Sequence, residues 1–149
     1  MSLPPDQLRK LFSRRVRRGT ILRATIEFIG GTGNIRAKYI VVVSNDPQNA
    51  DPIVFFITTS QMAAYEKNAV FKENAVILAP KTIAELPLKT AINCRELYEF
   101  PRKDVEDLVA NGEAAIVADL PDPIVAQIDE IVRKSKLISP ADKKKILGG

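Results

Sequence analysis

The sequence predicts a mainly β protein with added helices, in the form of a small twisted β-barrel followed by one well-formed helix. Two observations predict this class. Short segments rich in β-branched residues recur from residue 20 to residue 118, and the clearest helical pattern comes only at residues 122–134. The regular alternation of strands and long helices that a doubly wound parallel sheet needs is missing. The 149 residues, 46% of them hydrophobic, suffice for one domain with a substantial core.

The chain is expected to open with a basic helix over residues 6–16. Two prolines precede this segment, and Leu8, Leu11 and Phe12 form an apolar stripe with most arginines on the other side. We predict three parts of the chain: an appendage at residues 1–17, the barrel domain at residues 18–134 and a basic tail at residues 135–149.

The middle of the chain is predicted to supply the strands. Residues 20–29 alternate and are rich in β-branched side chains, and residues 39–44 form a nearly continuous apolar run, which is typical of a strand buried on both faces. Further strands are expected at residues 52–58, 74–79, 89–92, 95–100 and 114–118. Helical turns are expected at residues 61–67, 101–109 and 122–134, and again after Ser139.

The rarest residue types exclude several kinds of chemistry. The chain has no histidine, which removes imidazole bases, catalytic triads and histidine-ligated zinc or haem. Its one cysteine, Cys94, excludes intramolecular disulfides and cysteine-clustered metal sites, and without a histidine it is better interpreted as a small core residue. We therefore expect neither a cofactor nor a metal. The apolar runs are too short to span a bilayer, so we expect a cytoplasmic protein with no membrane partner.

Positive charge is concentrated at the start of the chain. Residues 1–40 contain nine lysines and arginines and two acidic residues, a net charge of +7, whereas the rest of the chain carries −3. Such a local patch fits a polyanion, and it predicts RNA-binding roles for Arg14, Arg15, Arg17 and Arg18. The alternative is a solvated helix face that only keeps the protein soluble.

A glycine-rich segment follows the first expected strand. Gly30, Gly31 and Gly33 suggest a dinucleotide-binding loop, but the third glycine position of G-x-G-x-x-G falls on Arg36 and no helical pattern follows. We interpret the segment as a flexible loop between two strands, placed where it can lie over a ligand.

Cations and hydroxyls lie at the ends of two apolar strands. Arg36 and Lys38 project to the same side by the strand period of two, which makes either a phosphate site or a solvated pair. Thr58, Thr59 and Ser60 end the strand that begins near residue 52. Hydroxyls in such a place either donate to phosphate oxygens or bond to the backbone and end the strand.

Four segments stand out when they are taken together. They are Lys38–Asp46 (KYIVVVSND), Ile57–Ser60 (ITTS), Thr90–Leu97 (TAINCREL) and the helix opened by Leu120, Pro121 and Asp122. Their order and spacing resemble the MazF/PemK family of toxin ribonucleases, whose patterns are approximately R-P-x-x-V-V-S-N-D, P-I-T-S, V-x-x-D-Q-I and a closing helix opened by L-S. The resemblance covers about residues 18–134.

The resemblance implies an SH3-like barrel, usually a homodimer, that cleaves single-stranded RNA without a metal and is neutralised by a cognate antitoxin. It implies catalytic roles for Lys38, in place of the family's arginine, and for Thr58, and Glu96 is our candidate base. The other residues expected to bind RNA are Gly31, Gly33, Arg36, Thr59, Ser60, Asn93 and Arg95.

The chain departs from the family pattern at Lys38, Tyr39, Asn93 and Arg95. Lysine keeps the charge of arginine but lacks its planar, bidentate fork, and the later strand lacks an acid that the family often carries. Two functions therefore stay open. One is a metal-independent endoribonuclease of a toxin–antitoxin pair. The other is a catalytically degenerate barrel that binds nucleic acid or a partner protein.

Overall fold

The computed structural model describes residues 3–26 and 36–148. The described helices are α1 (Pro5–Arg15), α2 (Ala63–Lys67), α3 (Ala69–Glu73), α4 (Arg102–Ala110), α5 (Asp122–Lys134) and α6 (Pro140–Leu147). The described strands are β1 (Thr20–Ile26), β2 (Arg36–Val42), β3 (Ile53–Thr59), β4 (Ala75–Leu78), β5 (Thr90–Phe100) and β6 (Ala114–Asp119). The helix predicted at residues 122–134 is confirmed with the same bounds. The two strands predicted at residues 89–92 and 95–100 are one long strand, β5.

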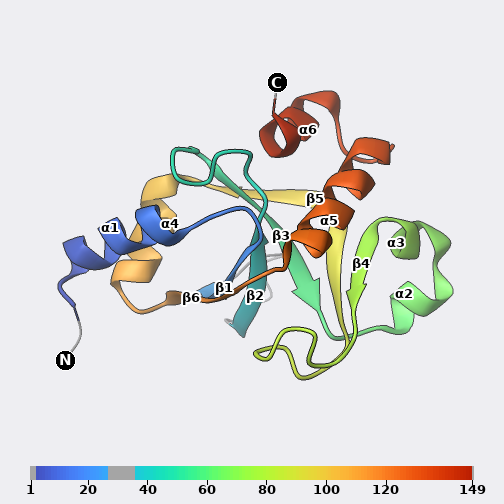
Figure 1. Cartoon of the computed structure of the whole chain (residues 1–149), viewed down its shortest axis with the longest axis horizontal. Coiled ribbons are helices and arrows are strands. Elements are labelled where there is room, and N and C mark those ends of the chain that lie inside the picture. Colours follow the sequence, from blue (N-terminus) through green and yellow to red (C-terminus); the bar gives the residue numbers. More distant parts are fainter. Residues whose placement is uncertain (1–2, 27–35, 149) are drawn as a thin grey trace.

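The six strands form one antiparallel sheet in the order β4-β5-β3-β2-β1-β6. The two end strands, β4 and β6, do not pair with each other among the described residues, so the sheet is open and the expected closed barrel is not seen. The fold is mixed α/β, with helices on both faces of the sheet (Figure 1). Both faces carry apolar side chains, so each needs its own helical layer, whereas a barrel would turn one face inward.

One face of the sheet packs against α1 and α4 and is called the α1/α4 face. Its core contains Phe12 and Val16 at the end of α1, Val105 of α4, and strand residues that include Ile40 and Phe55. Phe12 and Val16 are 2% and 0% exposed, so the N-terminal helix is packed into this core. Figure 1 shows α1 and α4 side by side. At the β4–β5 end, Tyr65 of α2 and Phe71 of α3 join the smaller cluster around Ala75 and Ala91.

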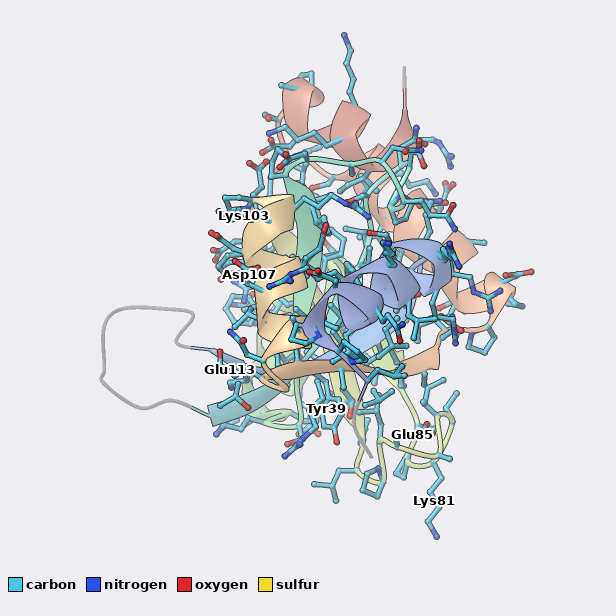
Figure 2. The ribbon with its side chains drawn as sticks, turned by 90° about the vertical axis from the view of Figure 1, so that its left-hand side faces the viewer. Tyr39, Lys81, Glu85, Lys103, Asp107 and Glu113 are labelled. Atoms are coloured by element: carbon cyan, nitrogen blue, oxygen red, sulfur yellow. The ribbon has the colours of Figure 1, made fainter. Side chains whose placement is uncertain are left out.

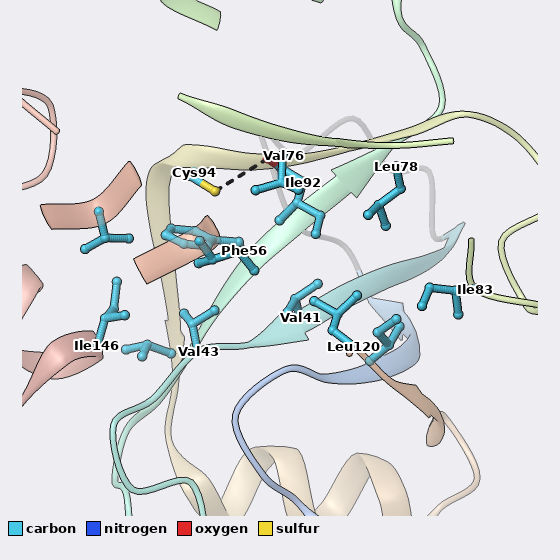
Figure 3. Packing of buried hydrophobic residues seen from close by; sticks show 14 of the residues in the cluster. Val41, Val43, Phe56, Val76, Leu78, Ile83, Ile92, Cys94, Leu120 and Ile146 are labelled. Atoms are coloured by element: carbon cyan, nitrogen blue, oxygen red, sulfur yellow. Dashed lines mark hydrogen bonds between the residues drawn. The ribbon is translucent and has the colours of Figure 1, made fainter. Parts of the chain in front are cut away.

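The opposite face packs against α5 and α6 and is called the α5/α6 face. Phe56, Val41 and Ile92 of the sheet meet Ile128 of α5 and Ile146 of α6 in the larger core cluster. Figure 3 shows the strand residues of this cluster with Cys94 among them. Cys94 is 0% exposed, which confirms the prediction that it is a small core residue, and burial raises the pKa of its thiol to about 12.

One arginine joins three segments at the end of the α1/α4 face. Arg102, at the start of α4, donates from Nη1 to the carbonyls of Pro47 (2.8 Å) and Ala50 (3.1 Å) and from Nη2 to Ser13 Oγ (2.8 Å). Its Nε also lies 3.8 Å from a carboxylate oxygen of Glu106. This side chain therefore holds α1, α4 and the turn after β2 together.

Candidate functional site

A large irregularity in β5 creates the candidate site. Asn93 pairs with Ile57 of β3 and Tyr98 pairs with Phe55, so four residues of β5 lie opposite the single residue Phe56. Residues directly opposite each other in an antiparallel pair share a face, and Phe55 and Ile57 both belong to the α1/α4 face. Asn93 and Tyr98 therefore lie on the same face although they are an odd number of residues apart. A bulge of this kind redirects side chains, which is its usual role near functional sites.

Lys38 and Thr59 extend the site across two more strands. Lys38 is exposed and pairs with Ala24 of β1, which belongs to the core of the α1/α4 face. Thr59 is half-buried and pairs with Ala91, two residues before Asn93. Ile40 is opposite Ile57, which is opposite Asn93, so Lys38 is offset by two residues and its Cα lies roughly 12 Å from that of Asn93 at ~4.8 Å per strand and ~3.4 Å per residue. A lysine, a hydroxyl and an amide thus share one face across β2, β3 and β5.

Thr58, the residue that the resemblance implied for catalysis, points to the opposite face. It alternates with Thr59 and lies in line with Phe56 of the α5/α6 core, and only 8% of it is exposed. Its Oγ1 donates a hydrogen bond of 2.7 Å to the carbonyl of Tyr39. Thr59 Oγ1 accepts a hydrogen bond of 3.1 Å from the Gln61 amide and is the hydroxyl on the face of Lys38. Ser60 is exposed beyond the end of the strand.

Arg95 lies over an aromatic ring in the middle of the irregular segment. Its guanidinium carbon is 3.5 Å from the centre of the Phe71 ring, and its backbone amide donates 2.9 Å to Asn93 Oδ1. Its Nε is buried without a hydrogen-bond partner. No described carboxylate forms an ion pair with Arg95, in contrast to most arginines of α1 and the turn after it. Within the described part of the chain, the Arg95 guanidinium is therefore fixed on a ring and is not in an ion pair.

Glu96 and Tyr98 form a hydrogen-bonded pair close to this arginine. The Tyr98 hydroxyl donates 3.3 Å to Glu96 Oε2, and Glu96 is exposed. Burial raises the pKa of Tyr98, and the charge and hydrogen bond of Glu96 raise it further, while the charge of Arg95 lowers it. The phenol therefore stays protonated at neutral pH and remains a donor. Glu96, the residue that the sequence suggested as a base, is thus an exposed carboxylate bonded to this phenol.

Three of the four N-terminal arginines that the sequence predicted for RNA binding are engaged by carboxylates. Arg15 and Arg17 contact Asp119 of β6 at 2.5 and 3.4 Å, and Arg18 holds Asp129 of α5 through two hydrogen bonds of 3.0 and 2.5 Å. Arg9 likewise contacts Asp107, which Figure 2 shows on α4 beside α1. Arg14 is exposed and has no ion pair with a described residue. Most of this charge therefore joins α1 and the turn after it to the rest of the protein.

Protonation of Asp119 at acid pH is expected to lower the free energy of unfolding. Burial by itself raises the pKa of Asp119, but hydrogen bonds from Arg15 and Thr20 and the charges of Arg15 and Arg17 outweigh burial and hold the pKa below its ordinary 3.8. A lowered folded pKa means that the stabilisation is full above 3.8 and is lost as the pH falls further. Asp119→Asn should therefore lower the free energy of unfolding by about 1.5–3 kcal/mol at pH 7.

Urea unfolding of Asp119→Asn and of the unaltered protein at pH 7, 5, 4, 3 and 2 checks this expectation. The two proteins should converge at the acid end, because a protonated Asp119 no longer attracts the arginines. Glu85→Gln, which changes an exposed carboxylate in the loop before β5, is the matched control and should differ little at any pH. A constant difference between Asp119→Asn and the unaltered protein at all five pH values would contradict the assignment.

The remaining predicted residues are placed as follows. Gly31 and Gly33 lie outside the described residues, and for Arg36 only the backbone is described, at the start of β2. Within residues 3–26 and 36–148, no group of three or more acidic or cysteine side chains is placed to hold a metal ion. None of the described helices is long and apolar enough to cross a membrane. Sequence reasoning missed Phe71 and Tyr98, because only the irregular course of β5 places them beside Arg95.

Comparison with known proteins leaves the site to be interpreted from its own geometry. No family model matches the chain, and no curated protein matches it.

Proposed function

We propose that the protein is a metal-independent endoribonuclease that cleaves single-stranded RNA and acts as the toxin of a toxin–antitoxin pair. The observation that carries the proposal is the arrangement of Lys38, Thr59 and Asn93 on one face of three adjacent strands, with Arg95 and Glu96 in the adjoining bulge, bonded to Asn93 and Tyr98. Two cations with polar side chains between them suit the phosphate backbone of a polyanion. Hydrogen-bond donors between them suit its phosphate oxygens.

The chemistry needs three operations on one phosphodiester. The 2′-hydroxyl must lose its proton and attack the adjacent phosphorus, the extra negative charge must be stabilised, and the leaving 5′-oxygen must gain a proton. In this proposal Glu96 takes the first proton, while Lys38 and Arg95 stabilise the pentavalent phosphate and Thr59 donates to it. In this proposal the protonated Tyr98 phenol, hydrogen-bonded to Glu96, gives its proton to the leaving oxygen, and Glu96 then returns the proton it took to Tyr98. The products are a 2′,3′-cyclic phosphate and a 5′-hydroxyl.

Thr59 takes the role that the resemblance implied for Thr58. The hydroxyl of Thr58 is committed to the Tyr39 carbonyl on the other face, whereas Thr59 shares a face with Lys38. We also propose that the open sheet is related to the SH3-like barrel that the resemblance implies. The consecutive neighbours β1, β2 and β3, with β6 returning to β1, fit a small SH3-like barrel that has opened between β4 and β6.

The family relationship also implies partners. We propose a homodimer that is restrained by a cognate antitoxin, because a toxin of this class must be held inactive in the cell that makes it. An acidic antitoxin segment would compete with RNA for the exposed charges of Lys38 and Arg95.

One observation favours a second function, RNA binding without cleavage. Arg95 is held on Phe71 and Lys38 stands where the family has an arginine, so the site can hold phosphates while lacking the bidentate fork at the position of Lys38. RNA binding and RNA cleavage both need the positive charges of Lys38 and Arg95. Only cleavage needs the 2′-hydroxyl and the hydroxyl of Thr59 at the reacting phosphate.

End-group analysis after incubation with mixed-sequence RNA in a metal chelator separates the two functions. The proposal expects 2′,3′-cyclic phosphate ends, no cleavage of DNA of the same sequence, and a rate lowered about 10- to 100-fold in Thr59→Val, because one hydrogen bond to the reacting phosphate is lost. Thr58→Val is the matched control. It should retain the rate and lose about 1 kcal/mol of stability with its bond to Tyr39. Intact RNA at protein excess overturns the nuclease, and retention of that RNA on a native gel would then favour the binding function.

A further inference from the structure

The contact between Arg95 and Phe71 is more constrained than a surface cation–π pair. Phe71 belongs to α3, whose first turn is fixed by Asn68 Oδ1, which accepts hydrogen bonds from the amides of Val70 (2.9 Å) and Phe71 (3.3 Å). The ring also contacts Tyr65 of α2, with ring centres 5.6 Å apart and planes tilted by 55°. The ring under Arg95 is therefore held from two sides.

Among the described residues, the guanidinium of Arg95 lacks one hydrogen bond. Its Nε is buried without a hydrogen-bond partner, and no described carboxylate pairs with its guanidinium. An unpaired polar atom of this kind costs free energy that folding alone does not recover. The stacking on Phe71 covers one face of the guanidinium and Nε is itself buried, so an incoming anion can reach only the opposite face and the edge formed by the two terminal nitrogens.

We propose that Phe71 is a positioning residue, which fixes the plane of the Arg95 guanidinium so that its edge binds one phosphodiester of a single-stranded RNA. The inference rests on the proposed function in one respect, that RNA is the anion. A guanidinium held in a plane can form two parallel hydrogen bonds to one phosphate without losing further side-chain freedom. A flexible lysine at residue 95 would supply the charge without that geometry.

The test measures RNA affinity and its salt dependence for four variants with a fluorescent, nuclease-resistant 2′-O-methyl oligonucleotide. Phe71→Leu should weaken binding about 3- to 10-fold, because the stacking is lost while burial is largely kept. Its slope of log affinity against log salt should be unchanged, since the charge of Arg95 remains. Phe71→Tyr should bind like the unaltered protein. Arg95→Lys should keep the slope and lose affinity, and Arg95→Ala should reduce the slope by about 0.7, the contribution of one phosphate on a single strand.

Ile77→Val is the matched control for loosened packing. Ile77 of β4 packs in the same small cluster as Phe71, and the substitution removes one methylene without changing an aromatic ring or a charge. The inference is overturned if Phe71→Leu binds RNA like the unaltered protein. It is also overturned if Ile77→Val or Phe71→Tyr weakens RNA binding as much as Phe71→Leu does. If the unaltered protein does not bind the oligonucleotide at all, the proposed function is overturned and the inference with it. RNA binding without an effect of Phe71 overturns the inference alone.

Discussion

Lys38→Ala should lower the rate of RNA cleavage roughly 10²- to 10³-fold, while the free energy of unfolding changes by less than about 0.5 kcal/mol. The side chain is exposed on β2 and forms no ion pair with a described residue, so its removal breaks no contact that supports the fold. In the proposed reaction its charge opposes the negative charge that develops on the phosphate. That interaction grows toward the transition state, so the loss should fall on the rate of the chemical step more than on binding.

Two further variants show whether the charge or its position matters. Lys38→Arg should retain the activity or raise it, because a planar fork suits the phosphate better than a point charge. Arg23→Ala is the matched control. Arg23 is exposed on the neighbouring strand, opposite Tyr39, and projects from the other face of the sheet. Single-turnover cleavage under chelating conditions gives the rates, and an equal loss in Arg23→Ala and Lys38→Ala would mean that only the general charge of the protein is needed.

The periodicity of apolar side chains predicted the strands and helices of this fold well. It did not predict which face of each strand lies beside which face of its neighbour. The alternation that predicted a strand over residues 20–29 and the helical pattern of residues 122–134 are local, and the structure confirms the strand over residues 20–26 and the helix in full. Residues 27–29 lie outside the described residues. The choice between Thr58 and Thr59 depends on which face of β3 meets Lys38. That is a matter of register between strands, and a shift of one residue exchanges the two faces.

The irregular course of β5 is the largest feature that the sequence did not reveal. Asn93, Arg95 and Glu96 were expected to contribute polar groups to the site. The structure joins the strands predicted at residues 89–92 and 95–100 through a bulge, which brings Arg95 beside Asn93 and over the ring of Phe71. A bulge leaves no periodic signal, because it is defined by its mismatch with the partner strand. Phe71 is 24 residues away from Arg95 in the sequence, so the pair had no local signature either.

The N-terminal arginines also have contacts that local sequence could not predict. The net charge of +7 over residues 1–40 predicted a basic patch, yet the carboxylates that engage Arg15, Arg17 and Arg18 come from residues 119 and 129. Partners about 100 residues away cannot be read from local charge. Among the described side chains of residues 1–40, the exposed cations without an ion pair to a described carboxylate are Lys10, Arg14, Arg23 and Lys38.

The largest loss of stability without a change at the candidate site is expected for Arg102→Ala. The variant should lose about 3–5 kcal/mol, because it leaves the carbonyls of Pro47 and Ala50 without their charged donor and Glu106 without its cation. The side chain of Arg102 is only 14% exposed, so water replaces these bonds incompletely. Urea unfolding monitored by far-ultraviolet circular dichroism measures the loss.

Arg102→Met keeps most of the aliphatic stem and separates lost packing from lost hydrogen bonds. It should be nearly as unstable as Arg102→Ala if the bonds to Pro47, Ala50 and Ser13 are what matter. Lys103→Ala is the matched control, an exposed cation next along α4 (Figure 2), and should change stability by less than about 0.5 kcal/mol. Below its unfolding transition Arg102→Ala should still bind RNA like the unaltered protein, because Lys38 and Arg95 lie on other elements. A stable Arg102→Ala protein would mean that α1, α4 and the turn after β2 are held together by their apolar contacts alone.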